Sequence, residues 1–300
     1  MILADATLKA INDALEQDQG AAFRQHLGKF LPLMKDAYQG ESTRPRGYFG
    51  ASSIGRECAR ELWYQFRWIK QPWFNGKTLR LFNRGHLEEA RILALLAMLG
   101  IEIHHADERG QQYGFVGYRG HLRGSGDGVV RGVLECPEDY LLLEIKTHND
   151  KSFNSLKQQG VLQSKPVHYR QIQAYLGHMK LEGALYVGVN KNTDDLHLEI
   201  IELNQETFER YLERAQRIID ARHVPVRIND SPGWYQCRIC DYYGVCHGDT
   251  PIRRTCRTCT WVSLEDNGVW RCTNPSGCLG DLDAKTQWEA CPAYDPLEHI

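Results

Sequence analysis

The chain has 300 residues, a length typical of one large domain or of a medium domain with a smaller appendage. Hydrophobic residues make up 42% and charged residues 25%, so the chain is globular and disorder as its main state is excluded. The longest apolar run, residues 92–99, is far shorter than the roughly 20 residues that span a bilayer. The N-terminus carries acids where a signal peptide is basic and apolar. We therefore expect a cytoplasmic protein without a membrane partner.

The net charge of −2 conceals a local excess of positive charge. Between residues 43 and 91, ten Arg and Lys stand against four Asp and Glu. Aromatic residues interrupt this basic segment: Tyr48, Phe49, Trp63, Tyr64, Phe66, Trp68, Trp73, Phe74 and Phe82. Basic side chains neutralise phosphates and aromatic faces stack on bases, so the segment predicts single-stranded nucleic-acid binding. The alternative is a basic rim over ordinary core aromatics.

The N-terminal half of the chain begins with predicted helices. Leu8, Ile11 and Leu15 recur at helical spacing, and the helical pattern ends near Gly40. Residues 81–99 form a long amphipathic pattern that predicts a second helical region. A glycine-rich stretch with strand-like alternation then occupies residues 114–135.

The remaining pattern alternates strands with helices. The predicted elements are a turn at 136–139, strands at 140–147, 184–190 and 196–203, and helices at 167–180 and 205–222. Their order predicts an α/β fold with a mixed central sheet flanked by helices. We expect three parts: a helical segment at 1–42, a core at 43–250 and a cysteine-rich metal module at 251–300.

Three charged residues are predicted to converge on this sheet. Glu144 and Lys146 are two apart on one strand, so they share a face, whereas Ile145 points the other way. A hairpin that turns at residues 136–139 pairs residues whose numbers sum to about 275, which brings Asp127 to the same end as Lys146. Two carboxylates and the Ile145 carbonyl are hard oxygen ligands suited to Mg²⁺ or Mn²⁺.

Two helices carry further candidates. His86 lies on the apolar face of the 81–99 helix, where its imidazole can ligate a metal. Gln171 and Tyr175 are four apart on the 167–180 helix and share a face. Each feature alone has an ordinary explanation: a solvated ion pair, a core histidine, a turn or simple packing. Their order along the chain carries more information than any one of them.

This order resembles the RecB-type branch of the PD-(D/E)xK nucleases. His86, Asp127, the Glu144-Ile145-Lys146 strand and the pair Gln171 and Tyr175 stand at its motif positions, over residues 52–246. The resemblance implies a restriction-endonuclease-like core and metal-dependent cleavage of DNA, in a bacterial or phage-infected cell. It also implies that Asp127, Glu144, Lys146, Gln171 and Tyr175 are catalytic and that His86 and Ile145 help to hold the metal.

The sequence departs from the motif at one position. Gly126 stands where the superfamily name expects proline. Glu138 and Asp139 are alternative acids for the metal, but they fall in the expected turn, away from Glu144.

Eight of the ten cysteines follow residue 236, which in a reducing compartment indicates metal ligation. Cys237, Cys240 and Cys246, with Cys58 far upstream, are similar to the iron–sulfur exonucleases of CRISPR adaptation and of AddAB. In those relatives one N-terminal and three C-terminal cysteines hold a 4Fe-4S cluster, which needs four thiolates. A four-thiolate zinc site at the same positions is the alternative.

The tail contains a second set of cysteines. Cys256 and Cys259 form a metal knuckle, and a hairpin with an Asn267-Gly268 turn delivers Cys272. Cys291 is the preferred fourth ligand of a Zn²⁺ ion, with Cys278 as the alternate, because the last twenty residues otherwise lack an anchor.

These features together predict a metal-dependent exonuclease that acts on single-stranded DNA or frayed DNA ends in recombination, repair or phage DNA processing. Protein partners in recombination or replication are compatible with this activity. The competing class is a non-catalytic nucleic-acid-binding or adaptor protein that keeps the metal sites. A sequence-specific endonuclease is disfavoured because the chain has no recognisable helix-turn-helix.

Overall fold

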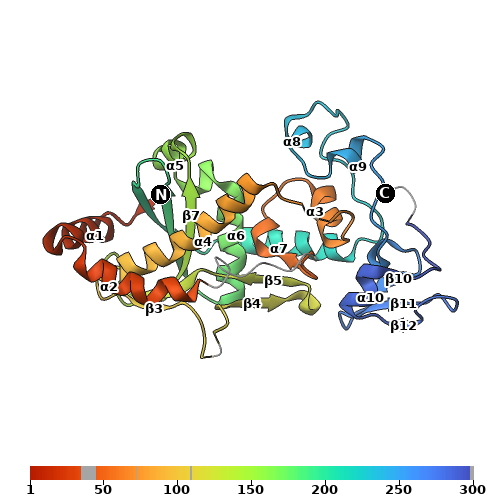
Figure 1. Cartoon of the computed structure of the whole chain (residues 1–300), viewed down its shortest axis with the longest axis horizontal. Helices are drawn as coiled ribbons and strands as arrows, with labels where there is room; N and C mark the ends of the chain where they lie inside the picture. The colour runs from red at the N-terminus through yellow and green to blue at the C-terminus, as the bar shows by residue number, and fades with distance from the viewer. Residues whose placement is uncertain (35–44, 72, 109, 298–300) are drawn as a thin grey trace. The chain divides into compact units, whose positions relative to one another are not determined.

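A computed structural model describes residues 1–34, 45–71, 73–108 and 110–297 (Figure 1). The chain divides into two compact units that each combine distant segments. The first unit consists of residues 1–41, 74–115 and 124–208, and the second of 42–73, 116–123 and 209–300. The expected end of the N-terminal helices near Gly40 and the expected boundary after residue 42 lie outside the described residues.

A mixed sheet forms the centre of the first unit. Among the described residues it has six strands, in the order β1-β9-β8-β7-β6-β3. The strands are β1 (Ile2–Leu3), β3 (Glu102–His104), β6 (Gly128–Arg131), β7 (Leu141–His148), β8 (Gly183–Asn190) and β9 (Leu196–Glu202). β7 and β8 are parallel, and the other neighbouring strands are antiparallel. Every residue of β8 is buried, as expected for a central strand covered on both faces.

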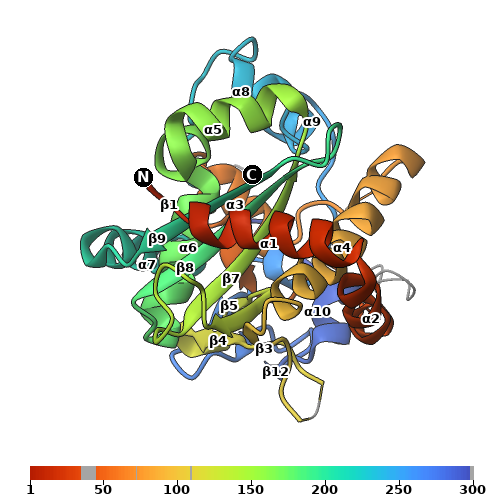
Figure 2. The same ribbon diagram turned by 90° about the vertical axis from the view of Figure 1, so that its left-hand side faces the viewer.

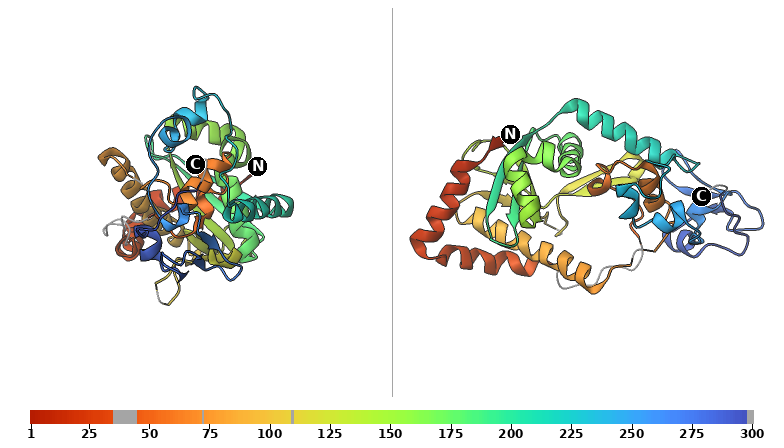
Figure 3. Two further views of the ribbon diagram at one scale, coloured as in Figure 1. Left: turned by 90° about the vertical axis from the view of Figure 1, so that its right-hand side faces the viewer. Right: turned by 90° about the horizontal axis from the view of Figure 1, so that it is seen from above.

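Helices cover both faces of this sheet (Figures 2 and 3). The helices are α1 (Asp5–Asp18), α2 (Ala21–Phe30), α4 (Gly76–Ala97), α5 (Asp150–Ser164) and α6 (Pro166–Met179). Apolar residues of α1 and α4 pack in one cluster with Leu143, Ile145 and Val187. Alternate residues of a strand point to opposite faces, so Glu144 and Lys146 face the side that carries α5 and α6.

The expected α/β architecture is present, but not all of its elements were anticipated. The expected helices at 81–99 and 167–180 correspond to α4 and α6. Helix α5 was missed because its polar composition hides a narrow buried stripe that includes Phe153 and Leu156. None of the helices in the described part of the chain has the length and apolar composition needed to cross a membrane.

The second unit consists of short elements. They are β2 (Phe49–Gly50), α3 (Ala59–Phe66), α8 (Tyr235–Arg238), α9 (Tyr243–His247), β10 (Val262–Leu264), β11 (Trp270–Cys272), β12 (Gly280–Asp281) and α10 (Ala284–Glu289). The expected hairpin joins β10 to β11. Its turn contains Gly268 at φ 82°, a conformation that glycine adopts without strain. Three elements, β4 (Gly114–Gly117), β5 (Leu122–Ser125) and α7 (Gln205–Asp220), contain residues of both units.

The C-terminal fifty residues do not form a separate part of the second unit. Arg257 is 3% exposed and donates hydrogen bonds to the carbonyls of Phe66 at 2.9 Å and Gly47 at 3.0 Å. Its guanidinium also lies 3.7 Å from the ring centroid of Trp68. In return, Arg67 donates to the carbonyl of Arg257 at 3.1 Å. The cysteine-rich tail and the α3 region therefore form one packed unit, unlike the division near residue 250 that we expected.

Replacing Arg257 by alanine should destabilise the second unit. The change removes the hydrogen bonds to the Phe66 and Gly47 carbonyls, the first of them buried, and the cation that covers the Trp68 ring. We expect a loss of about 3 kcal/mol in the free energy of unfolding, measured by urea denaturation. Arg271→Ala, which removes an exposed ion pair with Asp281, is the control and should cost less than about 1 kcal/mol. Equal stability of the two variants would contradict this packing.

Candidate active site

The candidate site forms where β6 stops pairing with β7. Gly128, the first residue of β6, lies opposite Leu143, so the residue before it, Asp127, reaches β7 next to Glu144. The numbers of paired residues, such as 128 and 143, sum to 271 instead of about 275, because the connection between β6 and β7 is centred earlier than the expected turn at 136–139. Asp127 nevertheless lies beside the part of β7 that carries Glu144 and Lys146, and its Oδ2 accepts a hydrogen bond from the Ile145 amide at 2.7 Å.

This contact determines the direction of the Ile145 carbonyl. In an extended strand, the N–H and C=O groups of one residue leave on the same side. The Ile145 N–H points to Asp127, so its carbonyl also faces the side on which β6 has ended. A carboxylate and a backbone carbonyl therefore open to one edge of the sheet, which fits the hard oxygen ligands expected for Mg²⁺ or Mn²⁺.

Gly126 occupies the position where the motif name expects proline, and the structure explains the exchange. The Gly126 N–H donates a hydrogen bond to the Tyr113 carbonyl at 2.9 Å, which proline could not do. A Cβ at this position would also lie only 2.6 Å from Leu142 Cδ1. Glycine thus allows the segment before Asp127 to pass close over β7.

Glu144 is the most deeply buried acid of the site. Its side chain is 1% exposed, and Oε1 accepts hydrogen bonds from Lys146 Nζ and from Gln171 Nε2, the latter at 2.8 Å. The Tyr175 hydroxyl donates to the Ser125 carbonyl at 2.8 Å, two residues before Asp127. The structure therefore brings together Asp127, Glu144 and Lys146, with Gln171 and Tyr175 of α6 behind them.

The three charged groups strongly affect one another. Burial and then the negative charge of Glu144 raise the pKa of Asp127 well above its usual range, although Lys146 partly offsets the effect. Burial alone would lower the pKa of Lys146, but Glu144 and Asp127 outweigh it and raise that pKa. Lys146 therefore stays protonated, and the raised pKa of Asp127 reflects the imbalance of two carboxylates against one ammonium. An additional cation would relieve this imbalance.

A third acid, Glu89, was missed by the sequence analysis. Its charge also contributes to the raised pKa values of Asp127 and Lys146, which places it near both groups. His86 lies one helical turn before it, with Nδ1 3.6 Å from Glu89 Oε1. The useful signal in the sequence was the three-residue spacing of His86 and Glu89, which puts both on one face of α4. The structure thus pairs His86 with an acid of the site.

A buried polar network continues from the site along the same face of the sheet. The Tyr186 hydroxyl lies 2.9 Å from His148 Nε2 and 2.9 Å from His168 Nδ1. Burial, followed by the charges of Lys165 and Lys146, lowers the pKa of His148 to about 4. Burial, followed by the charge of Lys146, lowers the pKa of His168 to about 3. Both imidazoles are therefore neutral near pH 7.

The four cysteines expected to hold a cluster lie in the second unit. Cys58 caps the N-terminus of α3, and its sulfur accepts a hydrogen bond from the Glu61 amide at 3.4 Å. Burial and then the charges of Cys246 and Cys58 raise the pKa of Cys237. The pKa of Cys240 rises to about 11, through burial and, among smaller effects, the charge of Cys58. The four thiols therefore share one neighbourhood.

The described residues contain no three Cys, His, Asp or Glu side chains that already lie at metal-binding spacing. The thiols and carboxylates must therefore draw closer around any ion that they bind. The chemistry of each donor set fits the expected group: oxygens at the sheet edge for a hard cation, and sulfurs in the second unit for iron or zinc.

The basic and aromatic segment divides into buried and exposed parts. Four of its aromatic residues are at most 2% exposed and belong to the core: Trp63, Tyr64, Phe66 and Trp68. For these four, the alternative of ordinary core aromatics under a basic rim holds. Phe74 and Phe82, in contrast, are 42% and 47% exposed, with ring centroids 5.0 Å apart. Trp73 is 80% exposed, so among the described aromatics of this segment Trp73, Phe74 and Phe82 have the ring faces most available to bases.

No protein-family model and no curated protein matches this chain. Among solved structures, it resembles SSO0001 with a TM-score of 0.43 and 15% identity, covering 77% of this chain and 99% of that one. It also resembles LHK-Exo, an alkaline exonuclease from Laribacter hongkongensis, with a TM-score of 0.40 and 15% identity, over 58% of this chain and 87% of that one. The LHK-Exo complex with dAMP gives the same score and identity, over 58% and 86%. Scores this low carry no argument about function, which depends on the geometry of the site itself.

The buried histidines should make the stability of the first unit depend on pH. His148 and His168 stay neutral in the folded protein, whereas histidines of the unfolded chain are protonated below about pH 6.5. The unfolded state therefore binds more protons, and the free energy of unfolding should decrease as the pH falls from about 6.5 towards 4. Each histidine contributes up to about 1.4 kcal/mol per pH unit.

Urea denaturation at several pH values tests this dependence. His168→Gln should give a flatter dependence than the unchanged protein, because glutamine does not titrate. His223→Gln is the control, since His223 is exposed in the structure. An unchanged slope in His168→Gln would contradict the assignment of a neutral, buried histidine.

Proposed function

We propose that this protein is a metal-dependent DNA exonuclease that acts on single-stranded DNA or frayed DNA ends. The observation that supports the proposal most directly is the convergence of Asp127, Glu144 and Lys146 where β6 leaves β7. Acids, an open backbone carbonyl and a lysine at one sheet edge are the groups that hydrolysis of a phosphodiester requires. The RecB-type motif order of these residues agrees with this chemistry.

Each residue then has a distinct task. Asp127, Glu144 and the Ile145 carbonyl would hold Mg²⁺ or Mn²⁺, with His86 and Glu89 beside them. A cation held there would supply a water of lowered pKa and would polarise the phosphodiester. Lys146 stabilises the negative charge that develops on the phosphate or orients the attacking water. Gln171 holds the Glu144 carboxylate, and Tyr175 anchors the segment before Asp127.

The same proposal includes a 4Fe-4S cluster on Cys58, Cys237, Cys240 and Cys246. Four free thiols in one neighbourhood match the ligand number of such a cluster. Backbone amides donate to two of the sulfurs: the Glu61 amide to Cys58 and the Tyr242 amide to Cys240, each at 3.4 Å. Donors of this kind stabilise thiolates. The cluster would join α3 to the α8–α9 region and act as a structural staple.

Cleavage is tested with end-labelled single-stranded and double-stranded DNA in the presence of Mg²⁺ or Mn²⁺. Glu144→Ala and Lys146→Ala should each lower the rate at least about 100-fold, because they remove charge stabilisation at the phosphate. DNA binding should change little, since phosphate contacts lie elsewhere. Closed circular single-stranded DNA should resist degradation, because an exonuclease needs an end.

The matched control is the double variant Glu138→Ala and Asp139→Ala. These acids are the alternative metal ligands suggested by the sequence, and Glu138 is 83% exposed in an ion pair with Arg131. The double variant should keep full activity. Full activity of Glu144→Ala would refute the nuclease site. DNA binding without any cleavage by the unchanged protein would instead favour the adaptor function.

The iron–sulfur cluster is tested by anaerobic purification. The protein should be brown and contain about four iron atoms per chain, as a thiolate-bound 4Fe-4S cluster requires. Cys58→Ser should lose the colour and the iron, whereas Cys136→Ser, which changes a cysteine of the first unit, should keep both. A colourless protein with zinc bound at Cys58, Cys237, Cys240 and Cys246 would show that this site holds zinc and not an iron–sulfur cluster.

A further inference from the structure

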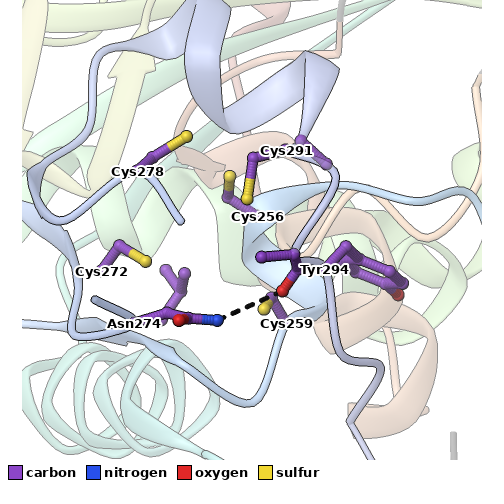
Figure 4. A pocket seen from close by; sticks show the side chains of 10 residues that line it. Cys256, Cys259, Cys272, Asn274, Cys278, Cys291 and Tyr294 are labelled. Atoms are coloured by element: carbon purple, nitrogen blue, oxygen red, sulfur yellow. Dashed lines mark hydrogen bonds between the residues drawn. The ribbon is translucent and has the colours of Figure 1, made fainter. Parts of the chain in front are cut away.

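A second metal site is indicated in the tail, where five cysteines line one small pocket (Figure 4). They come from separate segments: Cys256 and Cys259 from the knuckle, Cys272 from β11, Cys278 from the loop after it, and Cys291 from the segment after α10. The pocket encloses about 10 Å³, about the space of one water molecule. It therefore has room for a single ion.

The other four cysteines of the pocket lie near Cys256. Burial and then the charges of Cys278, Cys291, Cys259 and Cys272 together raise the pKa of Cys256 to about 12, so all four side chains lie near it. Cys291 Sγ lies 3.3 Å from the position that a Cβ on Gly277 would take, next to Cys278 in the chain, and the Cys278 and Cys291 thiols are within hydrogen-bonding reach of each other. All five cysteines are free, so none is committed to a disulfide.

The rest of the lining contains no charged residue. Asn274 and Tyr294 are the polar neighbours, and the remainder is apolar. A pocket whose donors are almost entirely sulfur selects a soft or borderline cation such as Zn²⁺ and disfavours Mg²⁺ or Ca²⁺. The region also needs such an ion, because strands of two or three residues cannot build a large core.

We propose that this pocket binds one zinc ion through Cys256, Cys259 and Cys272, and that Cys278 and Cys291 share the fourth position. Structural zinc is held by four tetrahedral ligands, so one of the five thiols must remain outside the coordination sphere. The two that contact each other can exchange with little movement of the chain. The assignment extends the four-cysteine site expected from the sequence, and it does not depend on nuclease activity.

The site would also stabilise the packing of the tail on α3. Arg257 stands between Cys256 and Thr258 in the knuckle, and it carries the buried hydrogen bonds to Phe66 and Gly47. A metal held by Cys256 and Cys259 fixes this arginine in position. Zinc binding is therefore coupled to the folding of the whole second unit.

Metal analysis of the purified full-length protein and of cysteine variants tests the proposal. Cys256→Ser, Cys259→Ser and Cys272→Ser should each lose one equivalent of zinc relative to the unchanged protein. Cys278→Ser and Cys291→Ser should each keep that equivalent, and the variant with both changes should lose it. Cys136→Ser is the control and should keep its zinc.

Alkylation of the folded protein followed by mass spectrometry gives a second measurement that requires no variant to fold. With zinc bound, the reagent should modify Cys278 in some molecules and Cys291 in others, while Cys256, Cys259 and Cys272 stay protected. Absence of zinc from the pocket would refute the site. Loss of zinc from Cys278→Ser alone or from Cys291→Ser alone would refute the shared position.

Discussion

The point at which β6 stops pairing with β7 is the constraint on which the candidate site depends. As long as two strands pair, their backbone groups satisfy each other and none is available to a ligand. Beyond Gly128 the pairing ends, and the Asp127 carboxylate takes over as the partner of the Ile145 amide. One carboxylate thereby completes the edge of the sheet, and the Ile145 carbonyl is left facing the same side.

The balance of charges at the site favours the binding of a cation. Asp127, Glu144 and Glu89 lie within electrostatic reach of Lys146, which is one cation among three acids. In a buried site it is costly to ionise all of these acids, which is why the pKa of Asp127 is raised, and a further cation would lower this cost. Two uncharged side chains of α6 add order without altering the charge. Gln171 donates a hydrogen bond to Glu144, and Tyr175 donates one to the Ser125 carbonyl in the segment before Asp127. Behind them the neutral His148, His168 and Tyr186 network extends the polar layer without adding charge.

The second unit is stabilised by a different means. Its strands are short, and its interior combines buried arginines with aromatic rings instead of a broad aliphatic core. The guanidinium groups of Arg67 and Arg257 lie 4.9 Å and 4.8 Å from the centroid of the Trp270 ring. Both arginines donate hydrogen bonds to backbone carbonyls. Nine free cysteines occur in the same unit. Ligation of metals by these thiols, as proposed above, would add folding free energy to a region that buries little apolar area.

The sequence alone determined most of the order of helices and strands, because hydrophobic periodicity reports which face of an element is buried, although the polar helix α5 escaped this signal. It also determined that Glu144 and Lys146 share a strand face, and that Gln171 and Tyr175 share a helix face, since local spacing is sufficient for both. The tertiary structure decided the register of β6 on β7, the approach of Glu89, the Tyr186 network and the meeting of five tail cysteines. It also joined the tail to α3. These features depend on contacts between residues far apart in the chain, and such contacts follow from loop paths and packing that local spacing does not encode.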